Sequence, residues 1–277
     1  MRWLHFILSH SIFISFCAVA LCYQTYTLLG LPSNNLVYLL VFSSTLCSYN
    51  AYWILSKFYF NSEVSFFRFI TLHFSNVLLF VLSSLAVLLC LFYVPDVLKF
   101  VLIAGLLTVL YTLPLWPGKW IRPAQYFGFI KTFLLALTWT YVTIVLPAQL
   151  KFDELDQTFV LLFIARLLFM LMLCAIFDSR DSAVDKVRGL KSLATDVSKR
   201  ALHLIMLISF TLYIIAGIAL RYQLHSVEQM LAFIATGAVV FTIYILSLKK
   251  QGYVFYYFIV DGLMLFSALA TFVAANV

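Results

Sequence analysis

The chain has 277 residues, of which 64% are hydrophobic and 10% are charged, and its formal net charge is +7. Soluble domains carry about a quarter charged residues, so this composition excludes an ordinary soluble domain. A mean hydropathy of +1.04 indicates an integral membrane protein. The basic residues are scattered over several segments, which argues against a nucleic-acid-binding surface.

Nine apolar stretches are long enough to cross a bilayer as helices, since one helical crossing needs about 20 apolar residues. None shows the alternating pattern of an outer-membrane barrel, so helices are predicted. In chain order the stretches are 3–22, 35–56, 71–93, 97–115, 126–147, 157–177, 202–220, 227–247 and 253–274. The predicted fold is an all-α integral membrane bundle of about nine transmembrane helices, forming one domain over residues 1–277.

The first stretch permits a second interpretation. Arg2, the apolar run and the small residues Ala18, Val19 and Ala20 also match a secretory signal peptide with its cleavage site. The apolar run continues beyond that site, which favours a first transmembrane helix that the protein keeps.

Lysine and arginine are distributed unequally between the two sides of the predicted bundle. Fourteen of the 18 fall on the side of the N-terminus, and Lys99, Lys151 and Arg221 fall on the other, while Arg166 lies within a helix. Cytoplasmic loops carry the excess of these residues in membrane proteins. The bias therefore predicts a multi-pass protein with a cytoplasmic N-terminus, located in the inner membrane if the source is bacterial.

Three hydrophilic segments on the predicted cytoplasmic side could cap a polar site: 57–70, 114–125 and 178–200. The second carries three prolines, which must interrupt a helix. The five cysteines all fall in apolar stretches without metal-ligand spacing and are read as small buried or lipid-facing side chains.

The segment after the sixth stretch is rich in acids and bases. Asp178, Asp181 and Asp185 fall within a sector of about 60° on a helix of 100° per residue. Carboxylates crowded on one face repel each other unless a cation lies among them, and Mg²⁺ prefers such oxygen ligands together with substrate phosphates. The alternative is a solvated helix of mixed charge at the membrane surface.

The same segment, DSRDSAVDKVRGLKSLA (178–194), resembles the second aspartate-rich motif of the UbiA superfamily of intramembrane prenyltransferases. That motif reads DxxDxxxD, followed by a glycine and a Ser/Thr-Leu pair. The resemblance implies transfer of an isoprenoid group from a prenyl diphosphate to a lipophilic acceptor, of the quinone type or another. It also implies Mg²⁺ as cofactor, bound by Asp178, Asp181 and Asp185 at the cytoplasmic end of the bundle.

The superfamily's first motif, NDxxDxxxD, is degenerate in this chain. Asn50 matches its leading asparagine, but Ala51, Ile54 and Phe58 stand at the aspartate positions. Three outcomes stay open: transfer with fewer metal ions, binding of a prenyl lipid without turnover, and a different transfer. Asn50 is a candidate substrate-binding residue, or simply the end of a helix that meets water.

Five basic residues are candidates for contacting substrate phosphates: Lys57, Lys119, Arg122, Lys131 and Arg188. Their alternative role is that of ordinary positively charged anchors on the cytoplasmic side. The sequence does not predict which acceptor, chain length or oligomeric state applies.

Two charges lie inside predicted helices at similar depth, Arg166 and Asp261. A lone charge at the bilayer centre costs roughly 3 kcal/mol, so such residues usually find partners. We expect these two to form an intramembrane ion pair. The alternative is a substrate or proton pathway, as in a small membrane transporter.

Overall fold

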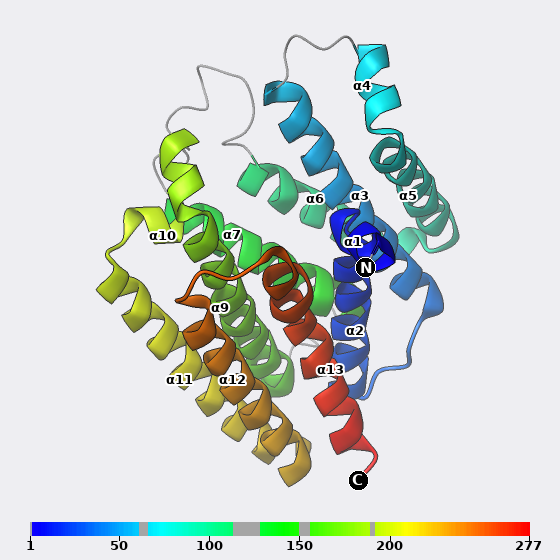
Figure 1. Cartoon of the computed structure of the whole chain (residues 1–277). Coiled ribbons are helices and arrows are strands. Elements are labelled where there is room, and N and C mark those ends of the chain that lie inside the picture. Colours follow the sequence, from blue (N-terminus) through cyan, green and yellow to red (C-terminus); the bar gives the residue numbers. More distant parts are fainter. Residues whose placement is uncertain (1, 61–65, 113–127, 150–155, 189–191) are drawn as a thin grey trace.

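The computed structural model describes residues 2–60, 66–112, 128–149, 156–188 and 192–277. It describes the side chains of 3–57, 68–112, 128–149, 156–182 and 192–277. The described residues form helices and short connections, arranged as a bundle (Figure 1). The predicted segment 114–125, with Lys119 and Arg122, lies outside the described residues.

The first predicted crossing is broken into two helices, α1 (Arg2–Ser9) and α2 (Ile12–Leu28), bent by 67°. The expectation of one continuous helix over 3–22 was therefore wrong. Ser11 has φ +62°, the left-handed conformation, which stops the helical hydrogen-bond ladder. The Asn50 side chain donates to the His10 carbonyl at 3.3 Å, so the break has a partner from another helix.

Three long helices follow. They are α3 (Asn35–Phe60), α5 (Phe74–Tyr93) and α6 (Leu98–Thr112), with the short α4 (Phe66–Leu72) before α5. The predicted stretch 71–93 is thus interrupted at His73, and a short 3₁₀ turn precedes α6.

The middle of the chain holds the longest helix. α7 (Gly128–Thr140) passes into a π-helical segment, Tyr141–Val145, and the short α8 (Leu146–Ala148). α9 (Gln157–Arg188) has 32 residues and continues without a break through the acidic segment. The predicted loop 178–200 is therefore mainly helix, and it continues into α10 (Leu193–Asp196).

The C-terminal part comprises α11 (Lys199–Leu224), α12 (Val227–Ser247) and α13 (Asp261–Ala275). Ser198 and Ser226 cap the first two, each accepting a hydrogen bond from a backbone amide in the first turn. A π-helical segment, Phe255–Val260, leads into α13.

Seven of the described helical stretches are long and apolar enough to cross a membrane, or eight if the bent pair α1–α2 counts as one crossing. α3, the remaining predicted crossing, has 26 residues, which exceeds the length that a crossing needs. Its middle is polar, with the run SSTLCSYN, which lowers its mean hydropathy. The predicted helical membrane bundle is confirmed.

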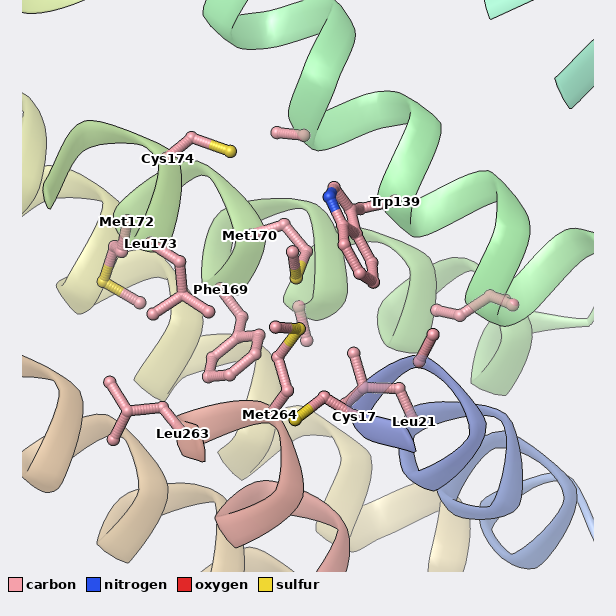
Figure 2. Close-up of a cluster of buried hydrophobic side chains, with 14 of the residues drawn as sticks. Cys17, Leu21, Trp139, Phe169, Met170, Met172, Leu173, Cys174, Leu263 and Met264 are labelled. Atoms are coloured by element: carbon pink, nitrogen blue, oxygen red, sulfur yellow. The ribbon is translucent and has the colours of Figure 1, made fainter. Parts of the chain in front are cut away.

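α9 forms the centre of this bundle, in contact with α7, α10, α11 and α12 (Figure 1). Its Phe169, Met170 and Met172 are buried in a cluster that Trp139 of α7 and Met264 of α13 complete (Figure 2). α5 and α6, by contrast, expose many leucines, as expected of helices that face lipid.

Candidate functional site

A cavity of about 860 Å³ lies between α3, α5, α6, α7 and the π-helical segment that follows α7. Most of its wall is apolar. The wall also contains side chains with hydroxyl groups. They are Ser44, Thr45 and Ser48 of α3, Thr108 and Thr112 of α6, and Thr138 of α7. Small-molecule sites in proteins have this size and this mixture of an apolar wall with a few polar groups.

One face of α6 creates much of the space. Ala104, Gly105, Thr108 and Thr112 recur at helical spacing along this face, and all line the cavity. A Cβ atom added at Gly105 would meet no other atom within 4 Å. Small side chains on α6 therefore keep the cavity open.

Aromatic side chains of α3, α6 and α7 form another part of the wall. Tyr49, Tyr52, Tyr111 and Trp139 all line the cavity. The rings of Tyr49 and Trp139 meet edge to face, with centroids 6.2 Å apart. Leu55 of α3, two residues before Lys57, and Thr112, the last residue of α6, also line the cavity, which therefore extends toward these ends of α3 and α6. The charged end of the bundle is the region where α9 ends and α10 begins.

Asp178 lies on α9 at this charged end, and protein groups surround its carboxylate. Oδ2 accepts a hydrogen bond from Thr132 Oγ1 at 2.5 Å and another from the backbone amide of Leu193 at 3.0 Å. Thr132 belongs to α7 and Leu193 to α10, so Asp178 joins three helices.

Asp181 forms an ion pair with its neighbour Arg180. Nε and Nη2 of Arg180 reach the two carboxylate oxygens, both at 2.7 Å. The guanidinium also lies about 5 Å from the ring centroids of Phe177, Tyr256 and Tyr257. Cation–π attraction and the two charge-assisted hydrogen bonds hold Arg180 in place.

The side chains of the other candidate residues at the charged end have fewer described contacts. The backbone of Asp185 and Arg188 continues α9, but their side chains lie outside those described. Lys131 is on the first turn of α7, and Lys57 lies 5.8 Å from the ring of Trp53. Within the described part of the chain, no three metal-ligating side chains gather at one point.

Asn50 is buried and has structural partners. Its amide group donates to the carbonyls of Leu46 and His10, and its oxygen accepts from Asn76 Nδ2 at 3.1 Å. It therefore supports the break between α1 and α2. A separate cavity of about 280 Å³ lies beside it, lined by His10, His73 and Asn76 among others.

The predicted ion pair between Arg166 and Asp261 is not formed, and this expectation is corrected. Arg166 donates to Gln24 Oε1 at 2.7 Å, to Thr143 Oγ1 at 3.0 Å and to the Leu21 carbonyl at 3.4 Å. Arg180 and Asp181 form an ion pair, whereas Arg166 and Asp261, both described, do not. Neutral acceptors from α2 and the π-helical segment satisfy the buried guanidinium instead.

Sequence reasoning predicted a cavity but missed the residues that line it and the partners of Asp178. The small residues on one face of α6 were the available signal for the cavity. No signal pointed to Thr132, because its contact with Asp178 joins residues 46 positions apart. Ala51 lines the cavity where the first motif would place an aspartate, so a methyl group stands there.

No protein-family model and no curated protein matches this sequence. Two solved structures are similar in fold. The apo structure of a UbiA homolog from Aeropyrum pernix K1 is 12% identical, with a TM-score of 0.55 over 94% of this chain and 97% of that one. A structure reported for digeranylgeranylglyceryl phosphate synthase is 16% identical, with a TM-score of 0.56 over 97% and 95%. The expected resemblance to the UbiA superfamily is confirmed at the level of the fold.

Proposed function

We propose that this protein is an intramembrane prenyltransferase, which transfers an isoprenoid group from a prenyl diphosphate to a lipophilic acceptor. The observation that carries the proposal is the cavity of about 860 Å³ between α3, α5, α6 and α7, which extends along α3 as far as Leu55, in a bundle with this fold. An apolar, branched chain fits a wall made of small aliphatic and aromatic side chains.

The aromatic wall suits the chemistry of an allylic cation. When a prenyl diphosphate loses its diphosphate, the positive charge left on the prenyl carbon needs a partner that is not a nucleophile. The rings of Tyr49, Trp139 and Tyr111 line the cavity and would offer π-electron density to this cation. A site closed to water would then favour transfer to an acceptor over hydrolysis.

Basic residues at the charged end would bind the diphosphate. Lys57 is on α3, Lys131 on α7 and Arg188 on α9, while Lys119 and Arg122 lie outside the described residues. Each cation would neutralise charge that develops on the departing diphosphate.

The described residues do not fit a bound Mg²⁺, which the aspartate-rich segment predicts. Asp178 accepts hydrogen bonds from Thr132 and Leu193, and Asp181 is paired with Arg180. α3 offers no carboxylate at the positions of Ala51 and Ile54. A metal ion would have to displace Arg180 from Asp181, so we assign Mg²⁺ no step.

The experiment is a turnover assay on the purified full chain. Farnesyl or geranylgeranyl diphosphate is supplied with a panel of quinone-type acceptors, with Mg²⁺ or with EDTA, beside an active prenyltransferase. We expect release of pyrophosphate that Trp139→Leu reduces strongly. Trp3→Leu is the matched control, because Trp3 is exposed and does not line the cavity. Pyrophosphate release that is absent with every acceptor would contradict the proposal.

A second candidate is binding of a prenyl lipid without turnover. The observation that favours it is Ala51, whose methyl group lines the cavity where a catalytic carboxylate would be expected. This candidate predicts saturable binding of farnesyl diphosphate, weakened by filling the cavity, with no release of pyrophosphate under any condition.

A further inference from the structure

The short segment Ser192–Asp196 is attached to α7 and α9 by several independent contacts. Its Leu193 amide donates to Asp178 Oδ2 at 3.0 Å and to Thr132 Oγ1 at 3.2 Å. Asp196 Oδ2 accepts a hydrogen bond from the Gly128 amide at 2.7 Å. Leu193 itself is fully buried. The attachment therefore joins a polar cluster to a buried apolar side chain.

Gly128, the first residue of α7, permits this close approach. A Cβ atom added there would lie 2.5 to 2.6 Å from the backbone atoms of Ser192. Backbone atoms cannot move aside as the end of a flexible side chain can. Any larger residue at 128 would therefore push Ser192–Asp196 away from α7, although it would leave every carboxylate intact.

Asp178 is the centre of the attachment. One oxygen of its carboxylate accepts from a hydroxyl on α7 and from an amide on α10. Hydrogen bonds to an ionised group are stronger than neutral ones. Without the carboxylate, the Leu193 amide would keep only its 3.2 Å hydrogen bond to Thr132 Oγ1, and the Thr132 hydroxyl would donate only to the Gly128 carbonyl.

We propose that Asp178 is a positioning residue, whose carboxylate fixes Ser192–Asp196 against α7, and that it is not a metal ligand. The contacts within the protein carry this assignment. Its consequence for ligand binding rests on the proposed function, because this segment adjoins the end of the bundle where the diphosphate would bind.

The substitution Asp178→Asn separates the two roles. Asparagine keeps one oxygen that can accept from Thr132 and Leu193, but it removes the negative charge that a divalent cation requires. Asp178→Ala removes both the accepting oxygen and the negative charge. A positioning residue therefore predicts a large difference between these two variants, whereas a metal ligand predicts that both fail.

The first test needs no ligand. Amide hydrogen exchange at Leu193 is measured on the purified full chain for wild type, Asp178→Asn, Asp178→Ala and Gly128→Ala. Asp96→Asn, at an exposed carboxyl group elsewhere, is the control. We expect the Leu193 amide to exchange about ten- to hundred-fold faster in Asp178→Ala and Gly128→Ala than in wild type. In Asp178→Asn and Asp96→Asn its exchange rate should stay within about three-fold of wild type.

Wild-type protection of Leu193 in Asp178→Ala would overturn the proposal. If that variant does not fold, Gly128→Ala and Thr132→Val report on the same amide, and unchanged protection in both would overturn it equally. The exchange experiment therefore tests the role of Asp178 whether or not the protein binds a prenyl diphosphate.

The second test is binding of farnesyl diphosphate with Mg²⁺ and with EDTA. We expect the dissociation constant of Asp178→Asn to stay within about three-fold of wild type, and that of Gly128→Ala to rise about ten-fold or more. Loss of Mg²⁺-dependent binding in Asp178→Asn, with Leu193 still protected, would identify a metal ligand and overturn the assignment. If wild type does not bind the probe, the proposed function fails, and the exchange experiment alone decides the role of Asp178.

Discussion

Asn50 shows how a single residue can match a motif and still serve the fold. Its side chain lies among Leu46, His10 and Asn76, and it is only 1% exposed. The break at Ser11 leaves backbone carbonyls without helical partners, and a buried carbonyl without a donor is costly. Asn50 supplies a donor to His10, which explains an amide at this position without reference to substrate.

A double-mutant cycle tests this role. We expect Asn50→Ala to lower the free energy of unfolding by about 1–3 kcal/mol, since it leaves buried groups unsatisfied. Asn76→Ala should cost a similar amount, and the double variant should cost less than the two together, because the residues share one hydrogen bond. Stability is measured by unfolding in mixed micelles. Additive losses would show that the two side chains act separately.

Arg166 is the other residue whose partners decide its role. It joins α2, α9 and the π-helical segment through Gln24, Thr143 and the Leu21 carbonyl. Gln24 in turn donates to Ser267 and Thr271 of α13. Arg166 is thus one end of a buried polar network, which explains a cation in the bilayer region without a carboxylate beside it.

We expect Arg166→Ala to lower the free energy of unfolding by about 2–4 kcal/mol, because Gln24 and Thr143 lose a charged donor and a space is left behind. The exposed Arg221, near the end of α11, is the matched control, and Arg221→Ala should change stability by less than about 0.5 kcal/mol. Comparison of unfolding midpoints in detergent checks this. Equal midpoints for the two variants would contradict the network.

At the scale of the elements, α6 has two faces that differ clearly in side-chain size and exposure. One side exposes Leu102, Ile103 and Leu106, while the other carries the small residues that line the cavity. Because α6 offers little bulk toward α3 and α7, the helices stand apart and leave room for a chain-like ligand. The size of this room should limit the length of ligand that enters.

Gly105→Leu tests whether the cavity holds the prenyl chain of the ligand. Nothing lies within 4 Å of the added Cβ, so the side chain enters the cavity without a clash. We expect the dissociation constant for geranylgeranyl diphosphate to rise about ten-fold, as roughly two methylene equivalents of burial are lost. Isopentenyl diphosphate should be affected little. Gly252→Leu, also in open space but outside the cavity, is the control. An equal loss of affinity for both ligands would show that the prenyl chain binds outside this cavity.

At the scale of the whole molecule, the number of crossings decides whether the two ends lie on the same side of the membrane. The structure has seven helices that are apolar and long enough to cross, or eight with the bent pair α1–α2. We expect the polar but long α3 to be a ninth crossing, the number that the charge bias predicts, and an odd number would place the ends of the described chain on opposite sides. The polar α3 is then shielded, because it packs between α2 and α5.

Reporter fusions in a bacterial host test the orientation. We expect an enzyme that is active only outside the cytoplasm to be inactive when fused after Lys250 and active when fused after Val277, because α13 lies between these points. A cytoplasmic reporter at the same two points should give the opposite pattern. Equal activity at both points would remove α13 from the crossings and contradict the odd number.

The sequence by itself determined the class of protein, the positions of most helices and the likeness to the UbiA fold. Hydropathy over about 20 residues is a local property, so windows such as 227–247 predict a helix with its observed bounds. The motif at 178–194 likewise lies on one continuous stretch of chain, and its resemblance could be read directly.

Only the tertiary structure decided what the polar residues contact. Asp178 meets Thr132, and Arg166 meets Gln24, across 46 and 142 positions of sequence. Spacing along one helix places a side chain on a face, but the partner depends on which helix packs there. The breaks at Ser11 and His73 and the cavity beside α6 have the same origin, since they depend on how neighbouring helices fit and on which buried groups then need a hydrogen bond.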